Sequence, residues 1–78
     1  MDSTFTPGYS ALGALYNKMN RPADAIQTLY RSLTISPTSI DNYMVYKNMA
    51  EAHFILEDYD MALEYLEQSK ALNPEYPE

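Results

Sequence analysis

The sequence has no cysteine, no tryptophan and only two glycines in 78 residues. Without cysteine, a disulfide framework, a thiolate metal site and a thiol nucleophile are excluded. No apolar run approaches the roughly 18 residues that a membrane-spanning helix needs. The first residues, Met1 to Thr4, also lack the basic start and apolar run of a signal peptide. We therefore expect a cytoplasmic chain that does not enter a membrane.

Positive charge is scarce as well, with five Lys or Arg residues against eleven Asp or Glu residues and a net charge of -6. Phosphate backbones repel such a chain, so nucleic acid is not an expected partner. The charge is unevenly spread along the sequence. Residues 6–39 hold three basic residues and one acidic residue, whereas residues 43–76 hold two basic and seven acidic residues.

Apolar spacing and prolines predict two helices in the first half of the chain. Thr6 offers a capping hydroxyl, and Pro7 suits the first helical position. Asn20 tolerates the left-handed conformation that ends a helix, and Pro22 then begins a second helix that stops before Pro37. The apolar stripes of the two helices are Tyr9, Leu12, Gly13, Tyr16 and Met19, followed by Ala25, Ile26, Leu29 and Leu33.

The second half predicts two more helices by the same signals. The third is expected to begin at Thr38 or Ser39, whose hydroxyls suit a cap. Asp58 is expected to cap the fourth, which must end before Pro74. The stripes are Tyr46, Met49, Ala50, His53 and Leu56, followed by Ala62, Leu63, Leu66 and Leu72.

A shift of 37 residues superposes the two halves of the chain. The signature W-x2-L-G-x2-Y, followed by Ala, a large apolar residue and Pro, is typical of the tetratricopeptide repeat. The first half has Tyr9, Leu12, Gly13, Tyr16, Ala25, Leu29 and Pro37 at these places, and the second half has Tyr46, Met49, Ala50, His53, Ala62, Leu66 and Pro74. The chain therefore resembles the tetratricopeptide repeat family over nearly its whole length.

The resemblance implies an all-α fold in which two tetratricopeptide-type helix-turn-helix hairpins stack as a short right-handed α-solenoid of four helices. Residues 1–78 would form one domain, with repeat 1 at about 6–39, repeat 2 at about 43–76 and a three-residue insertion near 40–42. It also implies a non-enzymatic scaffold without a cofactor, which binds a peptide or helix of a partner protein in a concave groove. The expected groove residues are Ser10, Ala14, Asn17, Lys18, Met44, Lys47, Asn48, Glu51 and Ile55.

One subclass of the family grips the C-terminal carboxylate of chaperones with Lys, Asn and Arg. Asn48 falls at one of these places, but Ser10 and Ala14 stand where that subclass has Lys and Asn. This difference argues against a chaperone tail as the ligand.

Small residues at matching places predict close contact between helix backbones. Gly13 and Ala50 lie on the first helix of each pair, and Ala25 and Ala62 lie on the second. We therefore expect Gly13→Leu to force a hairpin apart.

Two features depart from the family pattern. The three residues beyond the usual period of roughly 34 are expected to extend the start of the third helix, around Ile40 to Asn42. Asn20 and Glu57 replace the usual turn glycine. Because glutamate disfavours the left-handed region, the second turn is expected to be strained or differently shaped.

His53 is the one histidine, and Glu57 follows it by one helical turn. Such a pair can present a metal or substrate site, but no third ligand stands at a confirming spacing. His53 aligns with Tyr16 on the apolar stripe. We therefore expect a structural histidine with a satisfied hydrogen bond, no metal site and no catalytic residue.

Self-assembly is the alternative to partner binding. The last helix would leave Leu63, Leu66 and Tyr65 uncovered, and its acidic half complements the mildly basic first half. End-to-end stacking or exchange of hairpins would then give a homo-oligomer. Three tyrosines off the stripes, Tyr43, Tyr65 and Tyr76, are candidate contact residues.

Overall fold

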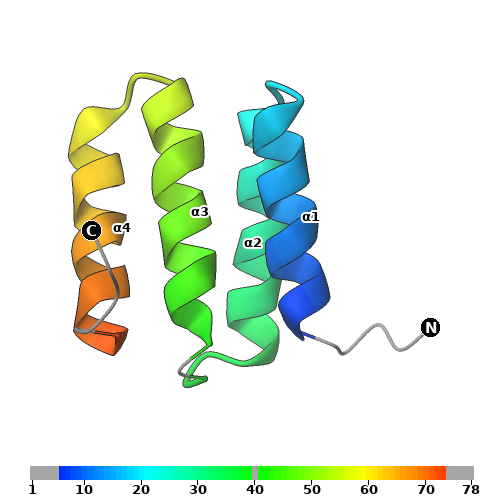
Figure 1. Cartoon of the computed structure of the whole chain (residues 1–78), viewed down its shortest axis with the longest axis vertical. Coiled ribbons are helices and arrows are strands. Elements are labelled where there is room, and N and C mark those ends of the chain that lie inside the picture. Colours follow the sequence, from blue (N-terminus) through cyan, green and yellow to red (C-terminus); the bar gives the residue numbers. More distant parts are fainter. Residues whose placement is uncertain (1–5, 40, 74–78) are drawn as a thin grey trace.

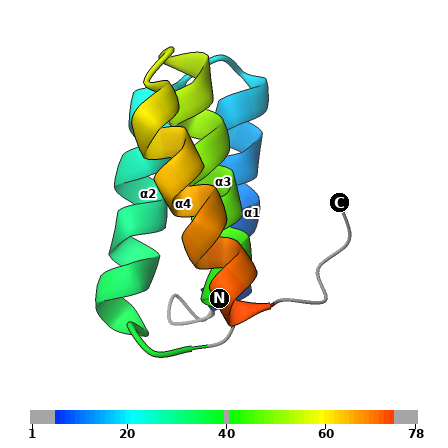
Figure 2. The same ribbon diagram turned by 90° about the vertical axis from the view of Figure 1, so that its left-hand side faces the viewer.

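The computed structural model describes residues 6–39 and 41–73, and these residues form four α-helices (Figure 1). The helices are α1 at Thr6–Lys18, α2 at Pro22–Ile35, α3 at Asn42–Ile55 and α4 at Tyr59–Leu72. Each hairpin pairs two consecutive helices, and α3 contacts α1, α2 and α4. Seen from the side, α4 lies nearest the viewer, with α3 and α1 behind it and α2 to its left (Figure 2). The predicted all-α fold of two stacked hairpins is confirmed.

Local signals place most of the helix ends where the sequence predicted them. Pro22 occupies the first position of α2, where its missing N–H costs no hydrogen bond. The side chain of Asp58 accepts a hydrogen bond from the Met61 backbone N–H at 3.5 Å and caps α4. These ends are therefore determined locally.

The start of α3 differs from the prediction, because the helix begins at Asn42 rather than at Thr38 or Ser39. The Ser39 hydroxyl accepts a hydrogen bond from the Asp41 backbone N–H at 3.2 Å, which competes with helix formation. Asn42 is fully buried and donates from Nδ2 to the Ser36 carbonyl at 2.6 Å. The expected helical extension over residues 40–42 is therefore wrong at Asp41, which lies in a turn, while Ile40 lies outside the described residues.

Both hairpins turn through a residue in the left-handed region, with φ of 60° at Asn20 and 64° at Glu57. The next residue in each turn donates its N–H to the carbonyl five residues back, Arg21 to Tyr16 at 2.9 Å and Asp58 to His53 at 2.8 Å. This is the pairing of a Schellman motif. The second turn is therefore shaped like the first, and the expected strain falls on Glu57 because its Cβ is crowded in this conformation.

Replacing Glu57 by glycine should relieve this strain. We expect Glu57→Gly to raise the free energy of unfolding by about 1 kcal/mol, which is roughly 4–8 °C in Tm for a domain of this size. Thermal unfolding followed by circular dichroism measures the change. The control Glu64→Gly, at an exposed position inside α4, should cost about 1 kcal/mol. Equal effects of the two substitutions would contradict the assignment of strain to Glu57.

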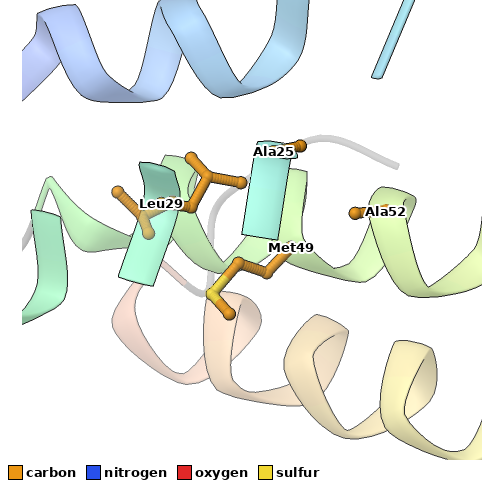
Figure 3. Close-up of a cluster of buried hydrophobic side chains, with 5 residues drawn as sticks. Ala25, Leu29, Met49 and Ala52 are labelled. Carbon is orange, nitrogen blue, oxygen red and sulfur yellow. The ribbon is translucent and has the colours of Figure 1, made fainter. Parts of the chain in front are cut away.

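The core lies mainly between the two hairpins. Its buried members are Ala25 and Leu29 of α2 and Val45, Met49 and Ala52 of α3. Figure 3 shows four of these side chains where α2 and α3 face each other. Full burial of a side chain such as Leu29 contributes roughly 1.5–3 kcal/mol, so this contact holds the hairpins together.

Equivalent positions of the two repeats differ sharply in burial. Leu29 is 0% exposed whereas its counterpart Leu66 is 43% exposed, and Met49 is 1% exposed whereas its counterpart Leu12 is 39% exposed. The buried pair faces the neighbouring hairpin, and the exposed pair lies on the outer helices α1 and α4. Position in the stack, rather than residue type, therefore decides which side chains form the core.

Gly13 permits the close approach of α1 and α2. A Cβ built at this position would lie 2.5 Å from both Cγ and Cδ2 of Leu29, a side chain with no exposed surface. The sequence predicted this role for Gly13, and the structure identifies Leu29 as the side chain that occupies the space. At the equivalent place in repeat 2, Ala50 replaces glycine and Leu66 is more exposed.

A methyl group at Gly13 should therefore overpack the hairpin. We expect Gly13→Ala to lower the free energy of unfolding by about 1–3 kcal/mol, and Gly13→Leu to lower it further. Gly8→Ala is the matched control, because a Cβ there meets no atom within 4 Å. It should be neutral or stabilising by about 0.5–1 kcal/mol. Urea unfolding measures both, and a Gly13→Ala variant stabilised as much as Gly8→Ala would refute the close contact.

Candidate functional site

A groove of about 430 Å³ lies between α1 and the start of α3. Its lining residues are Ser10, Ala11 and Ala14 of α1, Asp41 just before α3, and Met44, Val45, Lys47 and Asn48 of α3. Four of the eight side chains are apolar, namely those of Ala11, Ala14, Met44 and Val45. Asp41 and Lys47 bring one charge of each sign, so the groove combines an apolar surface with a mixed polar edge.

The helices beside the groove are joined by buried hydrogen bonds. The Asn48 Nδ2 donates to the Ser10 carbonyl and to the Ser10 hydroxyl, both at 3.2 Å. The Asn17 Nδ2 donates to the Asn48 carbonyl at 3.0 Å. All three residues are buried. These bonds fix α1 against α3, because buried polar groups are costly unless they are paired.

Five of the nine residues expected to bind a partner line this groove: Ser10, Ala14, Met44, Lys47 and Asn48. The other four lie further along the same two helices. Asn17 is buried, Lys18 and Glu51 are exposed, and Ile55 is half-buried. Their role in binding stays a prediction, but the amide groups of Asn17 and Asn48 already bond within the protein.

Three lining residues, Ala11, Asp41 and Val45, were absent from the sequence prediction. Ala11 could have been found, because it precedes Ala14 by three residues on the same helical face. Asp41 could not, since it belongs to the connection whose path depends on the buried Asn42. Val45 lies off the apolar stripe predicted for the third helix, yet it is buried in the core and also lines the groove.

Tyr65 does not extend from the last helix as the sequence suggested. Its ring stacks on Tyr46 at 6.0 Å and on His53 at 5.4 Å between centroids, and it packs against the core. Burial raises the pKa of the Tyr65 hydroxyl, and the nearby Tyr30, Glu64 and Tyr46 raise it further. As a correction, the uncovered face of α4 is that of Leu63 and Leu66 without Tyr65.

The other two tyrosines proposed as contact residues are Tyr43 and Tyr76. Tyr43 is half-buried, and its carbonyl accepts a hydrogen bond from the Ser69 hydroxyl at 2.8 Å. Tyr76 lies outside the described residues. Tyr43 is not among the residues that line the groove between α1 and α3.

His53 is held by stacking rather than by the expected hydrogen bond. Its Nδ1 lies 3.6 Å from the Asp58 carboxylate and has no hydrogen-bond partner among the described residues. Across the described parts of the chain, no group of three or more His, Cys, Asp or Glu residues is placed to hold a metal ion. The nearest acidic partner is therefore Asp58, whereas the sequence pointed to Glu57.

The sequence profile of the tetratricopeptide repeat family matches residues 8–75. The chain belongs to the tetratricopeptide repeat family. Comparisons with curated proteins and with solved structures give no match. Tetratricopeptide repeats are generally protein–protein interaction modules and are typically non-catalytic. Within residues 6–39 and 41–73, no helix has the length and apolar character that crossing a bilayer requires.

The buried amide of Asn48 should contribute measurably to stability. We expect Asn48→Ala to lower the free energy of unfolding by about 1–3 kcal/mol, because it leaves both Ser10 oxygens without this donor. The exposed amide Gln27 gives the control, and Gln27→Ala should change stability by less than about 0.5 kcal/mol. A double-mutant cycle with Ser10→Ala should show a coupling of at least about 0.5 kcal/mol. Additive effects would show that the Asn48 amide does not interact with the Ser10 hydroxyl.

Proposed function

We propose that the groove between α1 and α3 binds a peptide or helix of a partner protein and that the chain acts as a non-enzymatic scaffold. The observation that carries this proposal is the groove itself, an apolar cavity of about 430 Å³ in a family of interaction modules. A cavity of this kind suits a bulky apolar side chain as an anchor. Met44, whose side chain is exposed and flexible, adapts readily to the shape of such an anchor.

The hydrogen bonds beside the groove argue for an apolar anchor rather than a carboxylate tail. A carboxylate needs free donors, but the Asn48 amide nitrogen is engaged with both oxygens of Ser10. Among the described residues, those that line the groove include no arginine, and Asp41 adds a negative charge. The ligand that fits is therefore an aliphatic or aromatic residue, with polar neighbours that pair with Asp41 and Lys47 at the edge.

Selection from a random peptide library displayed on phage tests this function. Enriched peptides, synthesised with a fluorophore, are measured by fluorescence anisotropy against the parent chain and Met44→Glu. We expect enrichment of peptides with a large apolar residue, and Kd at least about tenfold higher for Met44→Glu, because a carboxylate in the groove must lose its hydration. Leu63→Glu makes the same change at an exposed leucine of α4 outside the groove and should leave Kd unchanged.

Two results would count against the groove as the binding site. A selection that yields only peptides binding both variants as tightly as the parent chain would place the site elsewhere. Enriched peptides that share a terminal carboxylate instead of an apolar residue would contradict the proposed anchor. Helical content by circular dichroism confirms that each variant remains folded before binding is compared.

A further inference from the structure

The outer face of α4 repeats the residues with which α2 packs against α3. Under the 37-residue shift, Leu63 corresponds to Ile26 and Leu66 corresponds to Leu29. In α2 these two side chains belong to the core between the hairpins, Leu29 fully and Ile26 in part. In α4 their counterparts are uncovered, with Leu63 59% exposed and Leu66 43% exposed. The face of α4 therefore carries a packing surface that the chain already uses once.

The outer face of α1 repeats the receiving side of the same contact. Leu12 corresponds to Met49 and Leu15 corresponds to Ala52, both of which are buried against the first hairpin. On α1 the two leucines are exposed, Leu15 to 50%. The face of α4 thus repeats the α2 side of the internal α2–α3 contact, and the face of α1 repeats the α3 side. Figure 1 shows α4 and α1 on opposite sides of the stack.

Charge favours the pairing of unlike ends. On α4, Asp60, Glu64 and Glu67 are exposed beside the leucines. The hairpin of α1 and α2 instead carries Lys18, Arg21 and Arg31 against the single acidic residue Asp24, which pairs with Arg21 at 2.8 Å. Contact between two α4 faces would bring acidic groups together, which is costly, whereas contact between α4 and α1 brings opposite charges closer.

We propose that a second copy of this chain packs its α1 against α4 of the first copy, in the register in which α3 packs against α2 within the chain. The contact is heterologous, because each copy uses different residues at its two ends. Association therefore continues head to tail, and its extent rises with protein concentration. The stacking residues do not line the groove between α1 and α3, so this interaction is independent of the proposed partner binding.

Blocking one end at a time gives a specific test. The first variant, Leu63→Glu with Leu66→Glu, blocks the α4 end, and the second, Leu12→Glu with Leu15→Glu, blocks the α1 end. Sedimentation velocity follows each variant, their equimolar mixture and the parent chain from about 10 µM to about 1 mM. All four leucines are at least 39% exposed, so circular dichroism should show an unchanged helical signal.

We expect the parent chain to form species larger than a dimer as concentration rises. Each blocked variant alone should remain a monomer, with association at least about tenfold weaker. Their mixture should form a dimer and nothing larger, because only one free α4 end and one free α1 end remain. The groove variant Met44→Glu, a control with an added carboxylate, should associate as the parent chain does.

Several outcomes would overturn the proposal. These are a parent chain that stays monomeric at about 1 mM, a blocked variant that still associates with itself, and a mixture that gives no dimer. A blocked variant that still associates with itself would instead indicate a symmetric contact or a different surface. If a double variant loses its helical signal, the single variants Leu66→Glu and Leu12→Glu replace it with the same expected pattern.

Discussion

The packing of α2 against α3 is the contact on which the structure depends. Leu29 is fully buried there, next to Gly13 on one side and the core residues of α3 on the other. Because α3 also contacts α1 and α4, the α2–α3 contact holds all four helices in one stack. A chain of 78 residues buries only a modest share of its surface, so few core side chains stabilise the fold and each of them matters.

The same constraint shapes the groove. Gly13 lets α1 approach α2, and the buried hydrogen bonds of Ser10, Asn17 and Asn48 fix α1 against α3. With both separations set, the side chains of Ala14 and Met44 line an opening that no neighbouring helix of the described chain fills. Polar residues that the sequence suggested as ligand contacts thus hold the walls of the groove in place, and the apolar side chains are left to meet a partner.

Stacking of similar units explains why the two repeats share a pattern yet differ in burial. A position such as that of Leu29 and Leu66 is core where a hairpin follows and surface where none is described. The repeat positions that are buried between the hairpins are therefore the same positions that are exposed on the outer helices α1 and α4. The register of the proposed head-to-tail contact is therefore that of the internal α2–α3 contact.

The sequence by itself determined the features that depend on neighbours within about one helical turn. These are the four helices, the left-handed turn residue Asn20 and the cap at Asp58, to which the repeat pattern adds the small residue Gly13 between paired helices. Each follows from local sterics or from the repeat period, and the repeat period also gave the family. The predicted fold could therefore be reached without any knowledge of long-range contacts.

Only the tertiary structure decided which polar and aromatic side chains are used inside the protein. Asn48 bonds Ser10 across 38 residues of sequence, and Tyr65 stacks on His53 of the neighbouring helix. The late start of α3 likewise follows from a buried Asn42 that bonds the Ser36 carbonyl. Helical spacing places such residues on a face, but burial and hydrogen-bond partners depend on the distance between helices, which is set by packing elsewhere in the molecule.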